Sequence, residues 1–189
     1  MDINFNNTKD LLLNASARVC GMVERLAGFN TGIKWKTVSF IIPIEPEPSH
    51  RPRLCGNRIY VPGAAKHQRY FDKNIRPKLN GLFINTPCKL NADVYCKTPV
   101  SFTQTQKILA EMKILRPWGN IGDVDNFLKT LMDQIQPNEH RGHVGIMSND
   151  CLVISSNVNK YYSMTPRSEI TITYMAKIPD ELKNVLRID

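Results

Sequence analysis

Several common features are missing from this chain of 189 residues. No apolar run approaches the ~18 residues that a membrane-spanning helix needs, and the first residues lack the basic and then apolar order of a secretory signal. The five cysteines are odd in number and form no C-x-x-C pair, which argues against a disulfide framework and against a zinc ribbon. No phosphate-binding glycine loop or dinucleotide fingerprint occurs, so we expect no nucleotide cofactor. The sequence therefore predicts a cytoplasmic protein in a reducing compartment, without membrane association.

Most of the positive charge is concentrated in one segment. The formal net charge is +8, from 25 basic and 17 acidic side chains. Residues 50–78 contain eight lysines and arginines but only one acidic residue, so this segment accounts for almost the whole excess. Concentrated basic charge is typical of surfaces that bind phosphate backbones, although a solvated basic surface has the same composition.

The hydrophobic pattern divides the chain into two parts. An apolar stripe that follows Thr8 and ends near Gly28 predicts an N-terminal helix. We therefore expect residues 1–35 to form a helical extension and residues 36–189 to form the main domain. The apolar fraction of 42% is enough for a folded core in a domain of this length.

The main domain is predicted to be α+β. Alternating apolar residues predict four strands, the last two joined as a hairpin, over residues 38–44, 88–96, 152–158 and 169–174. Helical spacing predicts helices over about residues 64–76, 103–112, 124–135 and 179–186. Cys88 and Cys96 lie on the apolar face of their strand, which favours a place in the core. We expect a small mixed, mostly antiparallel sheet of about four strands with helices packed on it.

Acidic residues surround the start of the helix predicted over residues 124–135. Asp125, Lys129 and Asp133 are four residues apart and share one polar stripe. Asp123 precedes the helix and points the same way as Asp125 if the backbone is extended there. Aspartates in these positions also cap helices, and an Asp–Lys pair one turn apart is an ordinary helix ion pair. The motif alone therefore leaves a purely structural role open.

A third carboxylate, Asp150, precedes the next predicted strand. Clustered carboxylate oxygens are the ligands that Mg²⁺ prefers, and such sites also accept Mn²⁺. Phosphodiester cleavage needs a metal-activated water, stabilisation of charge on phosphorus and help for the leaving oxygen. Three aspartates and a lysine beside a basic segment provide these groups. By contrast, His140 and His143 are interpreted as part of a polar surface loop, and Cys55 has no base near it in the sequence.

The order of these motifs resembles the RusA family of Holliday junction resolvases. A strand leads through a proline into an R-P-R motif and a tyrosine; D-x-D-N-x-x-K-x-x-x-D follows, and then a carboxylate before a strand. The resemblance covers about residues 37 to 175. The residues that carry it are Arg51, Pro52, Arg53, Tyr60, Asp123, Asp125, Asn126, Lys129, Asp133 and Asp150.

The resemblance implies a Mg²⁺-dependent homodimer, of phage or prophage origin, that places paired symmetric nicks in a four-way DNA junction. It implies that Asp123, Asp125 and Asp150 bind the metal. It also implies that Lys129 neutralises developing charge or orients the attacking water, with Asn126 and Asp133 in supporting roles. The residues expected to contact DNA phosphates are Arg51, Arg53, Lys66, Arg69 and Lys73.

The sequence departs from the family pattern in three places. Asn149 stands where an acid often precedes the third aspartate, the connection from Asp133 to Asp150 is longer than in compact members, and residues 1–35 lie outside the family core. The first two departures leave open a nuclease of the same chemistry that acts on other branched DNA, such as flaps or forks. Two further alternatives are a non-catalytic basic nucleic-acid-binding protein and a phage regulator whose N-terminal helix binds a host protein.

Overall fold

The computed structural model describes residues 18, 21, 34–49, 53–55, 58–60, 64–119, 121–176 and 180. The chain forms two compact units, one of residues Lys36–Tyr174 and one of the two ends, Met1–Trp35 with Met175–Asp189. Nearly all of the predicted N-terminal helix and of the helix predicted over residues 179–186 lies outside the described residues. The assignment of residues 1–35 as a helical extension stays a prediction.

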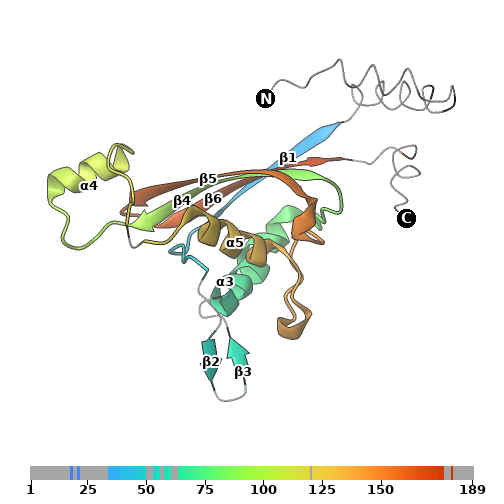
Figure 1. The fold of residues 1–189 in the computed structure, drawn as a ribbon, viewed down its shortest axis with the longest axis horizontal. Coiled ribbons are helices and arrows are strands. Elements are labelled where there is room, and N and C mark those ends of the chain that lie inside the picture. The colour runs from blue at the N-terminus through green and yellow to red at the C-terminus, as the bar shows by residue number, and fades with distance from the viewer. Residues whose placement is uncertain are drawn as a thin grey trace. The chain divides into compact units, whose positions relative to one another are not determined.

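A four-stranded sheet organises the larger unit (Figure 1). Strand β4 pairs antiparallel with β6 and parallel with β5. The spatial order is β1-β6-β4-β5, in which the strands are β1 (Trp35–Ile42), β4 (Cys88–Lys97), β5 (Val153–Ser163) and β6 (Arg167–Met175). The predicted α+β class with a mostly antiparallel sheet of four strands is confirmed.

Strand β1 continues the sheet in the antiparallel sense. Thr37 Oγ1 lies 3.1 Å from Thr173 Oγ1, and Ser39 Oγ lies 2.9 Å from Thr171 Oγ1. From Thr37 to Ser39 the residue number rises in β1, while the partner in β6 changes from Thr173 to Thr171. The two strands therefore run in opposite directions. These hydroxyl pairs lie on the face of the sheet opposite to the buried residue Ile42.

The predicted hairpin between the last two strands is wrong, because β4 lies between β5 and β6. Every second residue of β4 is buried, and Leu90 and Val94 have no exposed surface, which places this apolar strand at the centre. Residues 164–166 join β5 to β6 and reach about 10 Å when extended. That length is enough to cross one intervening strand at ~4.8 Å spacing.

The two cysteines of β4 are core residues, as predicted. Cys88 and Cys96 are buried, and burial raises the pKa of each thiol to about 11. A buried thiol with a raised pKa stays protonated at neutral pH and is a poor metal ligand or nucleophile.

Two helical segments pack on one face of the sheet (Figure 1). One is α5 (Val124–Ile135), with the predicted bounds. The other begins as α3 (Ala64–Tyr70) and continues through a π-helical turn, Phe71–Ile75, into a 3₁₀ turn, Arg76–Leu79. The change of helix type has a local cause, since Pro77 has no N–H to donate to the carbonyl of the preceding turn.

The remaining elements are short. Helix α4 (Gln104–Glu111) is capped by Thr103, whose hydroxyl accepts from the backbone N–H of Gln106 at 3.3 Å. The Gln106 side chain returns a hydrogen bond by accepting from the Thr103 N–H at 2.8 Å, which completes a capping box. Strands β2 (Arg53–Cys55) and β3 (Arg58–Tyr60) pair as an antiparallel ribbon.

The loop after α5 folds back onto the core instead of lying on the surface. The backbone N–H groups of Ile146 and Met147 both donate to the Ile135 carbonyl, at 2.7 and 3.0 Å. His143 is only 3% exposed; its Nδ1 lies 2.7 Å from a carboxylate oxygen of Asp72 and its Nε2 lies 2.8 Å from the Gln134 carbonyl. The surface-loop interpretation is therefore wrong for His143, because both ring nitrogens have partners inside the fold.

Two glycines of this loop provide a matched test of the fold. Gly142 and Gly145 both have a positive φ, of 63° and 64°, but only Gly145 is crowded: a Cβ there would lie 2.5 Å from the Ile135 carbonyl oxygen. We expect Gly142→Ala to lower the free energy of unfolding by about 1–2 kcal/mol, through the left-handed conformation alone. We expect Gly145→Ala to lower it by about 2–5 kcal/mol, because overpacking is added. Equal losses in urea titrations of the two variants would contradict this packing.

Candidate active site

The start of α5 presents two carboxylates to solvent. Asp123 occupies the N-cap position with an extended backbone, at φ −80° and ψ 155°, and Asp125 lies in the first turn. Both side chains are exposed. The backbone at Asp123 is therefore extended, which is the condition under which Asp123 and Asp125 were expected to point the same way. Within the described part of the chain the Asp123 side chain forms no capping hydrogen bond. Asp123 therefore does not cap α5 through its carboxylate.

Three contacts from outside the helix hold this turn in place. Gly122 has φ 103°, and a Cβ at this position would lie 2.7 Å from Cβ of Pro48. The Ser49 N–H donates to the Asn126 carbonyl at 2.9 Å. The ammonium group of Lys160, on β5, donates to the Gly122 carbonyl at 2.6 Å. The residues that carry the carboxylates are thus fixed by the segment after β1 and by the sheet.

Lys129 and Asp133 continue along α5, one and two turns after Asp125. Lys129 is exposed, whereas Asp133 is half-buried. Burial raises the pKa of the Asp133 carboxyl, and the negative charge of Asp150 raises it further, while Lys129 and Arg141 act in the opposite direction. Lys129 and Asp150 are therefore close enough to Asp133 for their charges to affect its pKa.

Asp150 lies at the start of a short 3₁₀ turn, Asp150–Leu152, immediately before β5. Its side chain is exposed. Asn149 caps this turn, because its side-chain oxygen accepts from the Cys151 N–H at 2.9 Å. The Asn149 side chain therefore stabilises the turn that presents Asp150.

The chemistry of the donors fits a hard divalent cation, but the structure does not gather them into a ready-made cluster. Asp123, Asp125 and Asp150 provide exposed carboxylate oxygens, which are the ligands that Mg²⁺ takes. Among the described residues, no group of three or more histidine, cysteine and acidic side chains is close enough to hold a metal ion. The helical rise also places Asp125 and Asp133 about 12 Å apart along α5.

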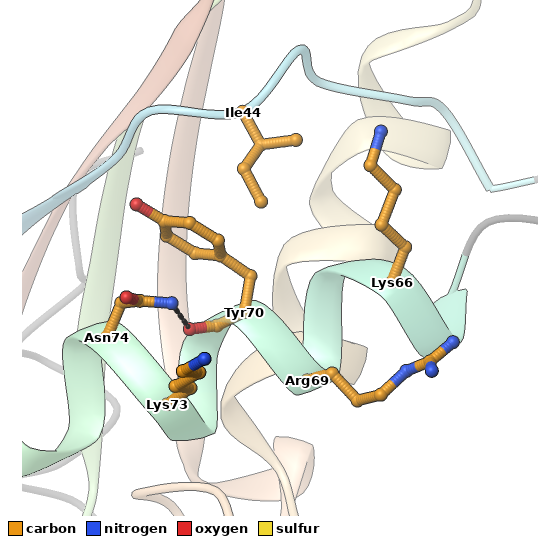
Figure 2. A pocket seen from close by; sticks show the side chains of 6 residues that line it. All are labelled: Ile44, Lys66, Arg69, Tyr70, Lys73 and Asn74. Atoms are coloured by element: carbon orange, nitrogen blue, oxygen red, sulfur yellow. Dashed lines mark hydrogen bonds between the residues drawn. The ribbon is translucent and has the colours of Figure 1, made fainter.

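The predicted phosphate-binding residues fall into two groups. Lys66, Arg69 and Lys73 are exposed along one side of the helical segment that begins with α3, and Figure 2 shows them around a pocket. Arg51 lies outside the described residues, and only the backbone of Arg53, in β2, is described. Sequence reasoning did not find that Ile44, Tyr70 and Asn74 complete the lining of this pocket.

A direct hydrogen bond joins the basic helix to the acidic one. The Gln68 side chain, on α3, donates from Nε2 to the Asp133 carbonyl at 2.8 Å. Arg141 in turn donates from Nη1 to Gln68 Oε1 at 3.1 Å. Gln68 is buried, so this contact lies on the side of α3 opposite to the exposed basic residues. The cations of α3 and the carboxylates of α5 thus belong to one packed unit.

Comparison with known proteins identifies the class to which this arrangement belongs. Residues 43–173 match the family described as endodeoxyribonuclease RusA, so this chain is a hydrolase that cleaves DNA strands internally. The chain belongs to the RusA family, whose enzymes act on Holliday junctions and bind branched DNA. It is similar to the uncharacterized protein YqaN of Bacillus subtilis strain 168, with 30% identity over 146 residues, which cover 71% of this chain and 94% of YqaN. No helix among the described residues is long and apolar enough to cross a membrane.

The turn before α5 can be tested with two glycines that differ in their surroundings. We expect Gly122→Ala to reduce DNA cleavage about 100-fold, because a Cβ would meet Pro48 and displace the adjacent carboxylates. Gly119 is the control: it also has a positive φ, of 74°, but a Cβ there meets nothing within 4 Å. Cleavage rates and far-ultraviolet circular dichroism of both variants make the comparison. Gly122→Ala activity equal to that of Gly119→Ala would show that the position of this turn does not matter.

The raised pKa of Asp133 has a consequence for stability. The folded state favours the protonated carboxyl, so its contribution to stability is present below the ordinary pKa of 3.8 and is lost as pH rises through the raised folded value. We expect Asp133→Asn to be more stable than the wild type at pH 7 without divalent metal, and the difference to shrink as pH falls towards 4. Thermal melting across this pH range measures the effect. A stability difference that grows on acidification would contradict the burial of this carboxyl.

Proposed function

We propose that the protein is a Mg²⁺-dependent, structure-specific endonuclease that resolves four-way DNA junctions by paired symmetric nicks. The observation that carries this proposal is the first turn of α5, where Asp123 and Asp125 are exposed and clamped by Pro48, Ser49 and Lys160. Exposed acidic groups that are held in place near exposed cations are suited to binding a metal ion and a phosphate.

Asp123, Asp125 and Asp150 would hold the metal ion, and their oxygen donors accept Mn²⁺ as well as Mg²⁺. When bound, the ion supplies an activated water and stabilises negative charge at the scissile phosphate. The separation of Asp150 from the first turn of α5 along the sequence means that the helix and the start of β5 must both be in place for binding. The proposed metal site therefore depends on the fold and not on a local peptide.

Lys129 is the cation nearest to the carboxylates along α5. Its ammonium group is exposed and one turn from Asp125, so it can donate hydrogen bonds to a phosphate oxygen as charge develops there. Asp133 lies one turn further and interacts with the charge of Lys129. In this proposal Asp133 is a positioning residue that keeps the lysine directed along the helix, and Asn126 supports the turn through its carbonyl.

The substrate is proposed from symmetry and charge. A four-way junction offers two equivalent scissile phosphates, and a homodimer with two-fold symmetry meets both with the same surface. The expected phosphate contacts come from the basic residues of the chain, Arg51, Arg53, Lys66, Arg69 and Lys73. A cytoplasmic location and an origin in a phage or prophage stay predictions.

Replacement of one carboxylate separates the enzyme from a non-catalytic DNA-binding protein. We expect Asp125→Asn to reduce junction cleavage about 100-fold or more, because charge stabilisation at the reacting phosphate is lost. Junction affinity should be unchanged or higher, since a negative charge next to phosphate is removed. Glu139→Gln removes an exposed acid elsewhere and should cleave like the wild type.

If Asp125→Asn cleaves normally and differs only in stability, the aspartates serve the helix and the catalytic assignment is wrong. Including flap and fork substrates in the same assay tests the substrate: equal cleavage of all branched DNAs by the wild type would replace the junction resolvase by a broader branched-DNA nuclease.

A further inference from the structure

A pocket of about 610 Å³ lies beside the basic helix, in a region to which the metal chemistry assigns no role. Figure 2 shows its walls: Ile44, from the segment after β1, faces the ring of Tyr70, and the helical segment contributes the rest. A volume of this size is within the range of small-ligand pockets, and the pocket is widely open to solvent. The lining residues are Ile44, Lys66, Arg69, Tyr70, Lys73 and Asn74.

The pocket carries positive charge that the protein itself does not neutralise. No ion pair within 4.0 Å joins Lys66, Arg69 or Lys73 to a carboxylate in the described part of the chain. The one acidic residue of residues 50–78, Asp72, is turned to the core, where it lies 2.7 Å from His143. On the segment that carries Ile44, the charge of Glu47 acts on His67, but Glu45 and Glu47 form no ion pair with the three cations in the described part of the chain. Arg69 Nε donates to the Ala65 carbonyl of its own helix at 3.1 Å. Among the described residues no carboxylate therefore competes with an anionic ligand for these three cations.

An aromatic wall stands next to these cations. Tyr70 is half-buried, and its carbonyl accepts a hydrogen bond from the Asn74 side chain at 3.1 Å. The following residue, Phe71, is fully buried and packs edge-to-face on Phe40, with ring centroids 5.7 Å apart. The backbone that carries Tyr70 is thus anchored in the core, while part of its side chain is left at the pocket.

Cations and an aromatic ring together select a particular kind of ligand. Paired bases in a duplex are stacked on each other, so a duplex offers phosphates and base edges but no free π-face to such a pocket. An unpaired nucleotide offers both a phosphate and a free π-face, and stacking on an aromatic side chain accepts any base. We propose that this pocket binds one unpaired nucleotide, with its phosphates held by Lys66, Arg69 and Lys73 and its base packed against Tyr70 and Ile44.

The proposal rests on the proposed function in one respect: the nucleotide belongs to a DNA strand at a branch point. The chain between Ile44 and Ser49 spans at most about 17 Å, and Ser49 is hydrogen-bonded to the first turn of α5. A strand whose nucleotide occupies the pocket would therefore lie within a few nucleotides of the carboxylates. The pocket would favour junctions whose branch point is open over fully paired DNA.

Binding of three DNAs to the full-length protein in EDTA tests the pocket without cleavage. The DNAs are a fully paired four-way junction, the same junction with two unpaired thymidines at its centre, and a linear duplex. We expect the wild type to prefer the opened junction, and Tyr70→Leu to weaken binding to that DNA about tenfold with little change for the duplex. Tyr70→Phe keeps the ring and should keep the preference.

Charge variants separate the two parts of the pocket. We expect Lys73→Gln to weaken binding to all three DNAs and to reduce the salt dependence by about one phosphate contact. Lys97→Gln, an exposed lysine on β4 outside the pocket, serves as the control. In addition, 5-iododeoxyuridine in place of the unpaired thymidines should crosslink to Tyr70 on irradiation.

The outcomes distinguish this inference from the function on which it rests. If Tyr70→Leu weakens binding to all three DNAs equally, or to none of them, the proposed site for an unpaired nucleotide is wrong, even when the wild type cleaves junctions. A crosslink to a residue outside the pocket would show the same. If the preference depends on Tyr70 but the wild type cleaves no branched DNA with Mg²⁺ or Mn²⁺, the pocket stands and the proposed nuclease function fails.

Discussion

The packing of α5 against the sheet is the interaction on which every candidate catalytic side chain depends. Phe127, Leu131 and Ile135 are almost fully buried and follow one another at a spacing of four residues. Each contributes about 1.5–3 kcal/mol by leaving water, whereas an exposed ion pair one helical turn apart contributes about 0.3–0.5 kcal/mol. The apolar face therefore determines how the helix lies, and the carboxylates and Lys129 are presented to solvent because they occupy the other faces.

The sheet and the segment after β1 then hold the first turn of α5 in a fixed position. Lys160 reaches Gly122 from β5, and Ser49 reaches Asn126 from the segment after β1. Helix α3 is joined to the same helix through Gln68. Acidic and basic groups that are far apart in the sequence are consequently held on neighbouring rigid elements, which is the arrangement that a metal-assisted reaction on a polyanion requires.

The features that depend on local periodicity could be predicted from the sequence. The alternation in β4 and the apolar stripe of α5 predicted the correct elements. The spacing of Asp123, Asp125 and Lys129 indicated a candidate site only together with Asp150 and the resemblance to the family, and the roles of these residues stay predictions. Pairing and long-range contacts could not be predicted in this way. The predicted hairpin was wrong because the sequence does not show which strand occupies the centre of a sheet. The surface position predicted for His143 was wrong because its partners, Asp72 and the Gln134 carbonyl, are brought to it only by the fold. The pocket was missed for the same reason, since Ile44 and Tyr70 are brought together only in three dimensions.

Cleavage of an immobile four-way junction, with strand-by-strand mapping of the cuts, distinguishes a junction resolvase from a protein that only binds DNA. We expect the wild type with Mg²⁺ to make two nicks at symmetry-related positions and to leave a linear duplex of the same sequence intact. We expect Asp123→Asn to make no nicks. Junction binding without cleavage in any divalent metal would contradict this expectation, and would mean that the acidic turn of α5 has no catalytic role.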